Sequence, residues 1–320
     1  MNSILSKAQL GTQPGGRPPA AVEITPEGVL AAALPAAGQD AVYAFEPLPP
    51  GALLPGIGEP NMRAPEAVAT AIRSALDQVS PRSRAVTVII PDTVVRVFVL
   101  DFDALPGKPA EAYPVLRFRL RKMVPFDVEH AGLSYQVLIE KKDETKVLAA
   151  VLPGPVLAEY ETAIRAAGYE PGAVLPSSLA ALAAVDSLEA VLVANISPLA
   201  LTTSIANGQD LLLYRTLDLP ENPVVRLDEV RRGVAVAAAY YEDKLGAPPS
   251  RLYFAGHTGL NEGGLNETSP NETSSAGFAR WIDFAGLNVV DLAARPSTGA
   301  VTSLGAASIA GVTGALAGVR

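Results

Sequence analysis

The chain has 320 residues, 49% of them hydrophobic and 18% charged, which is typical of a globular protein with room for two domains or one bilobed domain. Its formal net charge of −8 argues against a nucleic-acid-binding protein, which would carry a basic surface. It has no cysteine, which excludes disulfides and thiolate chemistry, and its only histidines, His130 and His257, argue against a histidine-rich zinc site.

The first structured element is predicted after a short lead-in. Residues 1–20 lack the apolar run of a signal peptide and are expected to form a flexible lead-in. Two β-capable runs then flank Glu27-Gly28, which predicts a hairpin over 21–33. Proline and glycine in 46–60 predict a loop, and apolar residues at helical spacing predict a helix from Pro65 to Val79.

The segment 84–168 is predicted to form a compact α+β subdomain of order ββαββα. Proline at 125 ends its first helix, because a proline ring clashes with a continuing helix. The expected strands are 84–90, 94–102, 133–140 and 146–152, and the expected helices are 110–124 and 155–167.

The second half repeats the opening pattern of strands. Asn207-Gly208 predicts a hairpin turn, since both residues tolerate positive φ. The expected strands are 191–197, 199–206, 211–219, 251–255 and 288–292, with a long helix at 227–245 and a polar loop at 261–277. Residues 299–319 carry no charge, but glycine, alanine, serine and threonine dominate, which favours a buried helix over a membrane span.

Several of these segments together resemble the PilM family, the cytoplasmic actin-like proteins of type IV pilus assembly machines. They are residues 90–100 (IPDTVVRVFVL), 116–129 (LRFRLRKMVPFDVE), 135–138 (YQVL), 227–232 (LDEVRR) and 252–260 (LYFAGHTGL). The cytoplasmic part of GspL, from a secretion system, is a related family. The resemblance covers about residues 21–320.

The resemblance implies an α/β fold of the actin-like (ribonuclease H-like) type, with two lobes and an inserted α+β subdomain. The first lobe would span 21–189 and include the insert at 84–168, the second would span 190–290, and residues 291–320 would return to the first lobe. It also implies a cytoplasmic protein at the inner face of the inner membrane, which docks the cytoplasmic N-terminal peptide of a PilN-like membrane protein.

The nucleotide motifs of actin-like ATPases are altered in this chain. Such enzymes hold Mg-phosphate with two hairpins, each opened by an Asp-Ile-Gly-like triplet. Here the first triplet begins with Glu23 and is followed by Pro26, whereas the second begins with Asn195 and is followed by Pro198. Proline lacks the N–H that a phosphate would use, and asparagine lacks the charge. We therefore expect no cofactor, no metal and no catalytic residue, and we disfavour ATP and Mg²⁺.

A nucleotide site, if present, would use a defined set of residues. They are Glu23, Thr25, Asn195, Ser197, Arg231, Arg232, Gly256 and His257. For the last four, the preferred interpretation is that the glycine closes a turn while the arginines and the histidine are solvated.

A partner surface is expected on the predicted 110–124 helix and on the strand before it. Arg117 and Arg121 lie one helical turn apart and could orient an acidic partner segment or approach anionic lipid. The alternative is a solvated helix face balanced by nearby carboxylates. Strand 94–102 could offer an edge to an extended peptide. The candidate partner-binding residues are Val95, Val97, Arg117, Phe118, Arg121 and Phe126.

Three functions follow as hypotheses. The first is a scaffold or adaptor of a type IV pilus or related secretion machine, which reaches the membrane only through its partner and binds no nucleic acid. The second is an active actin-like ATPase or small-molecule kinase with Mg-ATP between its lobes. The third is the soluble part of a GspL-like protein that would continue into a membrane helix after Arg320. A homo-oligomer is left open.

Overall fold

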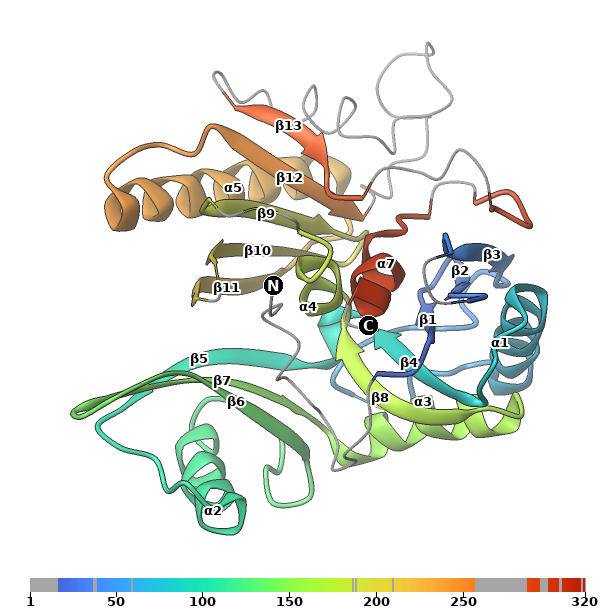
Figure 1. Ribbon diagram of the computed structural model, residues 1–320, viewed down its shortest axis with the longest axis horizontal. Coiled ribbons are helices and arrows are strands. Elements are labelled where there is room, and N and C mark those ends of the chain that lie inside the picture. The colour runs from blue at the N-terminus through green and yellow to red at the C-terminus, as the bar shows by residue number, and fades with distance from the viewer. Residues whose placement is uncertain are drawn as a thin grey trace.

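The computed structural model describes residues 17–36, 39–58, 60–185, 187, 189–208, 210–256, 287–293, 299–304, 307–317 and 319. Within these residues the chain forms two five-stranded sheets and one three-stranded sheet, arranged as two lobes and a smaller unit beside them (Figure 1).

The first lobe is a mixed sheet of order β3-β2-β1-β4-β8. β1, β2 and β3 form an antiparallel meander, and β4 and β8 extend it in parallel. The strands are β1 (Ala20–Ile24), β2 (Gly28–Ala33), β3 (Val42–Pro47), β4 (Ala85–Ile90) and β8 (Glu170–Pro176). The predicted hairpin over 21–33 is therefore confirmed as β1 and β2.

Helices cover both faces of this sheet, which explains why β1 is buried along its whole length. On one face Val22 packs in a core with Ile72 and Tyr160, from α1 (Pro65–Val79) and α3 (Gly154–Ala166). On the other face Ala21 packs with Ala180 and Val312, from α4 (Ser177–Leu182) and α7 (Ala310–Ala317). Successive strand residues point to opposite faces, so both faces require apolar side chains.

The second lobe repeats this topology, with order β11-β10-β9-β12-β13. Three antiparallel strands are again extended by two parallel ones. They are β9 (Val191–Ile196), β10 (Ala200–Asn207), β11 (Asp210–Asp218), β12 (Arg251–Gly256) and β13 (Asn288–Asp291). α5 (Pro223–Leu245) packs on one face, and its first turn is capped by the Asn222 side chain. The two lobes therefore share one sheet topology.

The third sheet is antiparallel, with order β5-β7-β6, and α2 covers one of its faces. Its elements are β5 (Arg96–Phe102), α2 (Pro109–Leu120), β6 (Gly132–Lys141) and β7 (Glu144–Leu152). In the predicted 84–168 segment, β4 and α3 pack in the first lobe instead, because β4 pairs with β1 and β8. The domain boundaries remain a prediction.

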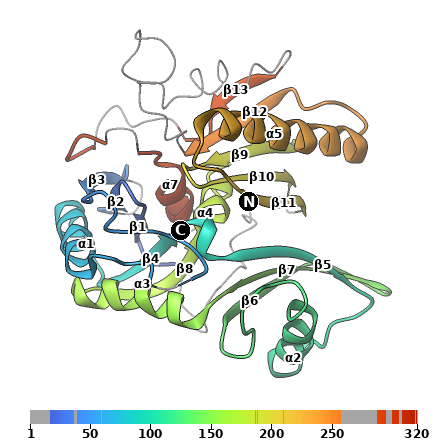
Figure 2. The same cartoon turned by 180° about the vertical axis from the view of Figure 1, so that it is seen from behind.

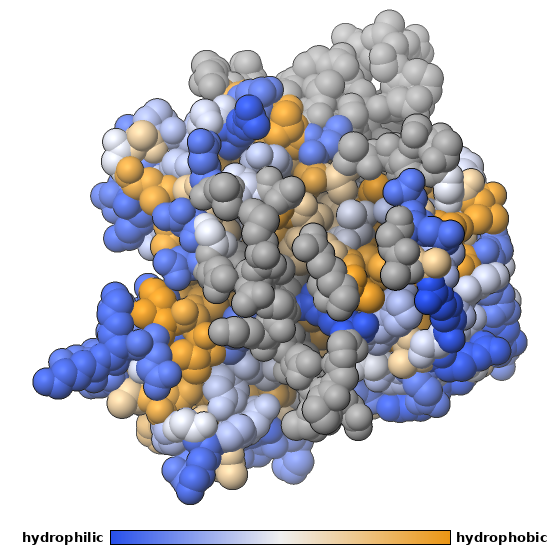
Figure 3. Space-filling view, in the orientation of Figure 1, coloured by the Kyte–Doolittle hydropathy of each residue, from blue (hydrophilic) through white to orange (hydrophobic). Residues whose placement is uncertain are grey.

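The other face of the three-stranded sheet turns toward the second lobe. Val97, Val99 and Leu138 pack there with Leu211 and Tyr214 of β11. Hydrophobic residues gather at this junction in the space-filling view (Figure 3). The inserted sheet is therefore fixed to both lobes.

Of the remaining predictions, some lie outside the described residues and one differs from the structure. Residues 261–277 and 1–16 lie outside the described residues. The helix expected over 299–319 is confined to α7, residues 310–317. In the part of the chain that the structure describes, no helix is both long and apolar enough to span a bilayer.

Candidate functional site

A cavity of about 250 Å³ lies where the hairpin turns of the two lobes approach each other. The β1–β2 turn contributes residues 23–27, and the β9–β10 turn contributes residues 195–199. Asp92, two residues after β4, and Gly256, the last residue of β12, also line the cavity. Five of the eight residues predicted for a nucleotide site meet here: Glu23, Thr25, Asn195, Ser197 and Gly256.

The backbone donors of the first turn are used within the turn. Thr25 N donates to Gly28 O at 2.9 Å, and Gly28 N donates to Thr25 O at 3.2 Å. Pro26, which lies between them, has no N–H. A phosphate therefore finds no donor at these three positions.

The second turn is closed in the same way. Ser197 N donates to Ala200 O at 2.8 Å. The Ser197 hydroxyl accepts from Leu199 N at 3.4 Å and from Ala200 N at 3.1 Å. Pro198 again lacks an N–H. The Ser197 side chain thus engages the backbone donors of this turn that a phosphate would use.

The carboxylate of Glu23 is already bound by the protein. It is only 8% exposed, and its Oε1 accepts from Ser177 Oγ at 2.6 Å. Gly311, in the first turn of α7, packs so closely that a Cβ atom there would collide with Glu23 Oε2. The positive end of a helix favours a carboxylate at this position. Glu23 therefore joins the first sheet to α4 and α7.

Asp92 is a site residue that the sequence analysis includes only within the quoted 90–100 segment. It is buried and accepts hydrogen bonds from Ser178 N at 3.1 Å and from Ser178 Oγ. It also accepts from Thr202 Oγ1 at 3.1 Å and from Tyr214 OH at 3.3 Å, both in the second lobe. Burial raises the pKa of Asp92, and the hydrogen bonds from Ser178, Thr202 and Tyr214 oppose this rise. The carboxylate thus links the two lobes.

Asn195 extends this link. Its amide lies 2.9 Å from Ser178 Oγ and 3.2 Å from Ser177 Oγ. When the amide oxygen faces these hydroxyls, the amide nitrogen donates to Ala255 O at 3.3 Å. The neighbouring Gly256 has φ +87°, and a Cβ atom there would collide with the carbonyl oxygen of Ile196. Asn195 and Gly256 thus form the part of the cavity wall that lies at the ends of β9 and β12.

The ionisable side chains among the described lining residues are all acidic. Glu23, Glu27 and Asp92 line it, and none of its described lining residues is lysine or arginine. A bound polyphosphate would therefore meet carboxylates, with no cationic side chain among the described lining residues to offset their charge.

The two arginines predicted for a nucleotide site lie elsewhere. Arg231 pairs with Asp228 at 4.0 Å, and Arg232 pairs with Glu229 at 2.7 Å, each within α5. Neither arginine lines the cavity. His257 lies outside the described residues. The structure thus does not bring these residues to the site.

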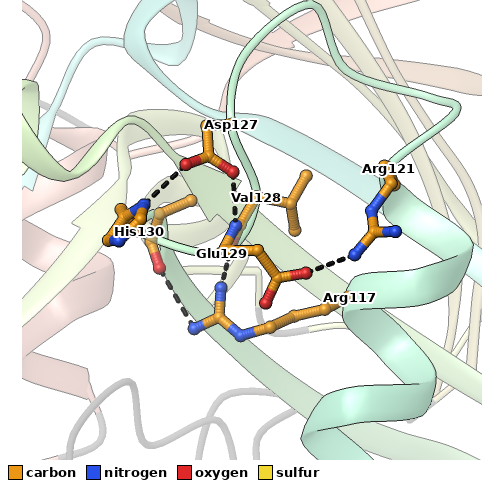
Figure 4. Close-up of polar contacts among 7 residues, drawn as sticks. Arg117, Arg121, Asp127, Val128, Glu129 and His130 are labelled. Atoms are coloured by element: carbon orange, nitrogen blue, oxygen red, sulfur yellow. Dashed lines mark hydrogen bonds and ion pairs between the residues drawn. The ribbon is translucent and has the colours of Figure 1, made fainter.

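The two arginines predicted for partner binding have different environments (Figure 4). The Arg117 guanidinium turns inward and donates to Val128 O and, at 3.3 Å, to Ala131 O. Arg121 forms an exposed pair with Glu129 at 2.5 Å. Arg117 therefore holds the segment after α2 in place, and only Arg121 is available at the surface.

The apolar candidates are mostly covered. Val95 is 3% exposed, and Val97 and Phe126 are half-buried against cores. Phe118, by contrast, is 70% exposed on α2. β5 pairs with β7 along one edge, and Arg96 at its start pairs with Asp218 of β11 at 3.7 Å. Among the six candidates, Phe118 and Arg121 are the exposed ones.

Comparison with known proteins places the chain by its fold. No protein-family model and no curated protein matches the sequence. The solved structure of a PilM-PilN type IV pilus biogenesis complex matches with a TM-score of 0.72 at 18% identity, covering 96% of this chain and 100% of that chain. The cytoplasmic domain of EpsL, an inner-membrane component of the type II secretion system of Vibrio cholerae, matches at TM-score 0.47 and 15% identity, covering 78% and 86%.

A Bacteroides thetaiotaomicron protein with an actin-like ATPase fold matches at TM-score 0.44 and 10% identity, covering 88% of this chain and 94% of that chain. The chain has an actin-like bilobed α/β fold, and the expected resemblance to PilM is confirmed at the level of the fold.

Proposed function

We propose that this chain is a PilM-like scaffold or adaptor of a type IV pilus or related secretion machine. It binds the cytoplasmic N-terminal peptide of a PilN-like inner-membrane protein and is held at the inner face of that membrane through this partner. It does so without a bound nucleotide.

One observation carries the proposal. The fold match to the PilM-PilN structure covers 96% of this chain and the whole of the other, so it takes in both lobes and the inserted unit. The agreement extends over the full length at a TM-score of 0.72, so the proposed role rests on analogy with the whole fold and not with one lobe.

The chemistry of the interlobe cavity supports binding of a protein partner over ATP hydrolysis. Hydrolysis requires groups that hold phosphate and a base that is free to act. Here backbone donors of both turns are used within the turns, and no lysine or arginine is among the described residues that line the cavity. Asp92 accepts bonds from Ser178, Thr202 and Tyr214, so its lone pairs are engaged. These features favour a pseudo-ATPase.

A direct test uses a synthetic peptide of the cytoplasmic N-terminus of the PilN-like protein encoded in the same genome, labelled with fluorescein at its C-terminus. We expect saturable binding to the full chain by fluorescence anisotropy, with micromolar or tighter affinity. A scrambled peptide of the same composition is the control. Equal binding of both peptides, or no binding of the native one, would refute the proposed function.

Calorimetry with ATP and Mg²⁺ tests the competing ATPase or kinase function. We expect no heat of binding at micromolar affinity, because a polyphosphate would face the carboxylates of Glu23 and Glu27, and no lysine or arginine is among the described lining residues. Micromolar binding of Mg-ATP would favour the enzyme instead.

A further inference from the structure

The outer side of α5 is exposed along the whole helix. Figure 2 shows the helix in front of the sheet of the second lobe, on which its inner side packs. The contact is close, because a Cβ atom at Gly233 would collide with the side chains of Leu201 and Leu217. A helix turns by about 100° per residue, so every exposed helix residue between 224 and 243 falls on one face about 140° wide. We call this surface the α5 face.

Half of the residues on the α5 face are apolar. Val224, Val225 and Val236 are 70%, 47% and 46% exposed. Ala235 and Ala239, near Val236 on the face, are exposed as well. The solvent-facing side of a helix ordinarily carries polar and charged residues. Apolar residues gathered on one exposed face therefore indicate a contact with another molecule.

The charged residues of the α5 face are arranged symmetrically about the apolar residues at 235–239. Arg231 and Arg232 precede these residues, and Glu242 and Asp243 follow them. At about 100° per residue, Arg231 and Glu242 lie along one side of the face, and Arg232 and Asp243 lie along the other. The order of charges is therefore complementary to its own reverse.

This order identifies the partner that the face fits. An acidic partner would be repelled by Glu242 and Asp243, and a basic partner would be repelled by Arg231 and Arg232. A second α5 laid antiparallel along the first satisfies both ends, because a two-fold axis at the level of Ala237 places each arginine opposite a carboxylate. Arg231 then faces Glu242 of the second copy, and Arg232 faces its Asp243. A parallel arrangement would place like charges together.

The charges of the α5 face can exchange their present partners at small cost. Their ion pairs within α5 lie at the surface, where such pairs contribute little to stability. The pairs are Arg231–Asp228 at 4.0 Å, Arg232–Glu229 at 2.7 Å and Asp243–Lys244 at 3.7 Å. A charge on a facing helix can therefore share or replace these contacts.

We propose that the α5 face is the contact surface between two copies of this chain, which associate through an antiparallel pair of α5 helices. The valines at 224 and 225 lie opposite residues 247–249 of the second copy, an Ala-Pro-Pro segment, so the ends of the contact are apolar as well. A single helix pair buries less surface than a stable dimer does, so the association is weak and depends on concentration. The proposal is independent of the proposed function, since it uses neither the interlobe cavity nor the partner peptide.

Cross-linking tests the position of the two-fold axis, because the chain has no cysteine of its own. Val236→Cys places a thiol next to the axis. The matched control, Val225→Cys, is nearly equally exposed on the same face, but the two copies of this position lie about 36 Å apart, at 1.5 Å per residue. We expect a short bis-maleimide to link Val236→Cys into a dimer and to leave Val225→Cys monomeric.

Charge reversal tests the pairing across the axis. We expect Arg231→Glu/Arg232→Glu and Glu242→Arg/Asp243→Arg each to raise the dimer dissociation constant about tenfold or more in sedimentation velocity, because like charges then face each other. An equimolar mixture of the two double variants should associate as tightly as wild type, since opposite charges again face each other. A loss of folding in either variant would not be rescued by mixing.

Three results would overturn the proposal. The first is a wild-type chain that remains monomeric up to about 1 mM. The second is equal cross-linking of Val236→Cys and Val225→Cys. The third is a mixture of the charge variants that associates no better than either variant alone. None of these results bears on the proposed function, which is tested by peptide binding.

Discussion

Replacement of Asp92 by asparagine should change how the stability of the protein depends on pH. Asp92 is a carboxylate of the first lobe, buried against Ser178, Thr202 and Tyr214. Burial raises its pKa above the ordinary value of 3.8. Asparagine has nearly the same shape as the neutral acid but does not titrate.

The sign follows from proton binding. As pH rises above about 4, the unfolded chain loses the Asp92 proton first, while the folded protein retains it. The folded state then binds more protons than the unfolded state, so wild-type stability falls with pH by up to about 1.4 kcal/mol per unit. This fall continues until the folded carboxyl itself ionises. Near pH 4 we expect wild type and Asp92→Asn to differ by only about 1 kcal/mol, because both side chains are neutral.

Urea unfolding of both proteins between pH 4 and pH 7 measures this contribution. Other titrating groups are common to the two proteins and cancel in the difference between their free energies of unfolding. We expect that difference to shift in favour of Asp92→Asn as pH rises. A difference that stays constant, or that shifts toward wild type, would show that Asp92 is not held with a raised pKa.

Three further changes test other contacts. Arg117→Met should lower the free energy of unfolding by about 2–3 kcal/mol, because it leaves two backbone carbonyls without their charged donor. Arg121→Met breaks only an exposed ion pair and should lower it by under about 1 kcal/mol. Equal shifts in the urea midpoint of the two variants would contradict this. Gly311→Ala should destabilise by about 1–3 kcal/mol in thermal unfolding, because its Cβ would collide with Glu23, and a neutral effect would count against this packing. Asn222→Ala removes the cap of α5 and should lower the free energy of unfolding by about 1 kcal/mol, also measured by thermal unfolding. An unchanged stability would contradict the role of Asn222 as a cap.

Local patterns in the sequence predict most of the elements. The α1 helix matches its predicted bounds, Pro65 to Val79, because apolar spacing and a first-turn proline agree there. The β10–β11 hairpin likewise follows from Asn207-Gly208, where glycine has φ +61°. β8 is missed because Pro171 and Gly172 interrupt it, and such residues ordinarily argue against a strand.

The sequence predicts only part of the candidate site, because local patterns do not show contacts between distant segments. Glu23 and Asn195 are found because each opens a hairpin motif that the sequence displays locally. Asp92 is missed because its importance depends on Thr202 and Tyr214, which are more than a hundred residues away. Sequence separation hides such contacts. The one available signal was a carboxylate two residues after a buried strand, within the quoted 90–100 segment.

The interlobe contacts bear on what kind of machine part this chain can be. In a nucleotide-dependent switch, a ligand with different affinity for open and closed states moves the lobes. Here Asp92 joins the lobes directly through Thr202 and Tyr214, and the turns bond to themselves. Bonds that form without a ligand favour one lobe arrangement whether or not a ligand is present. A fixed arrangement would suit the proposed scaffold, because a docking surface must keep its shape.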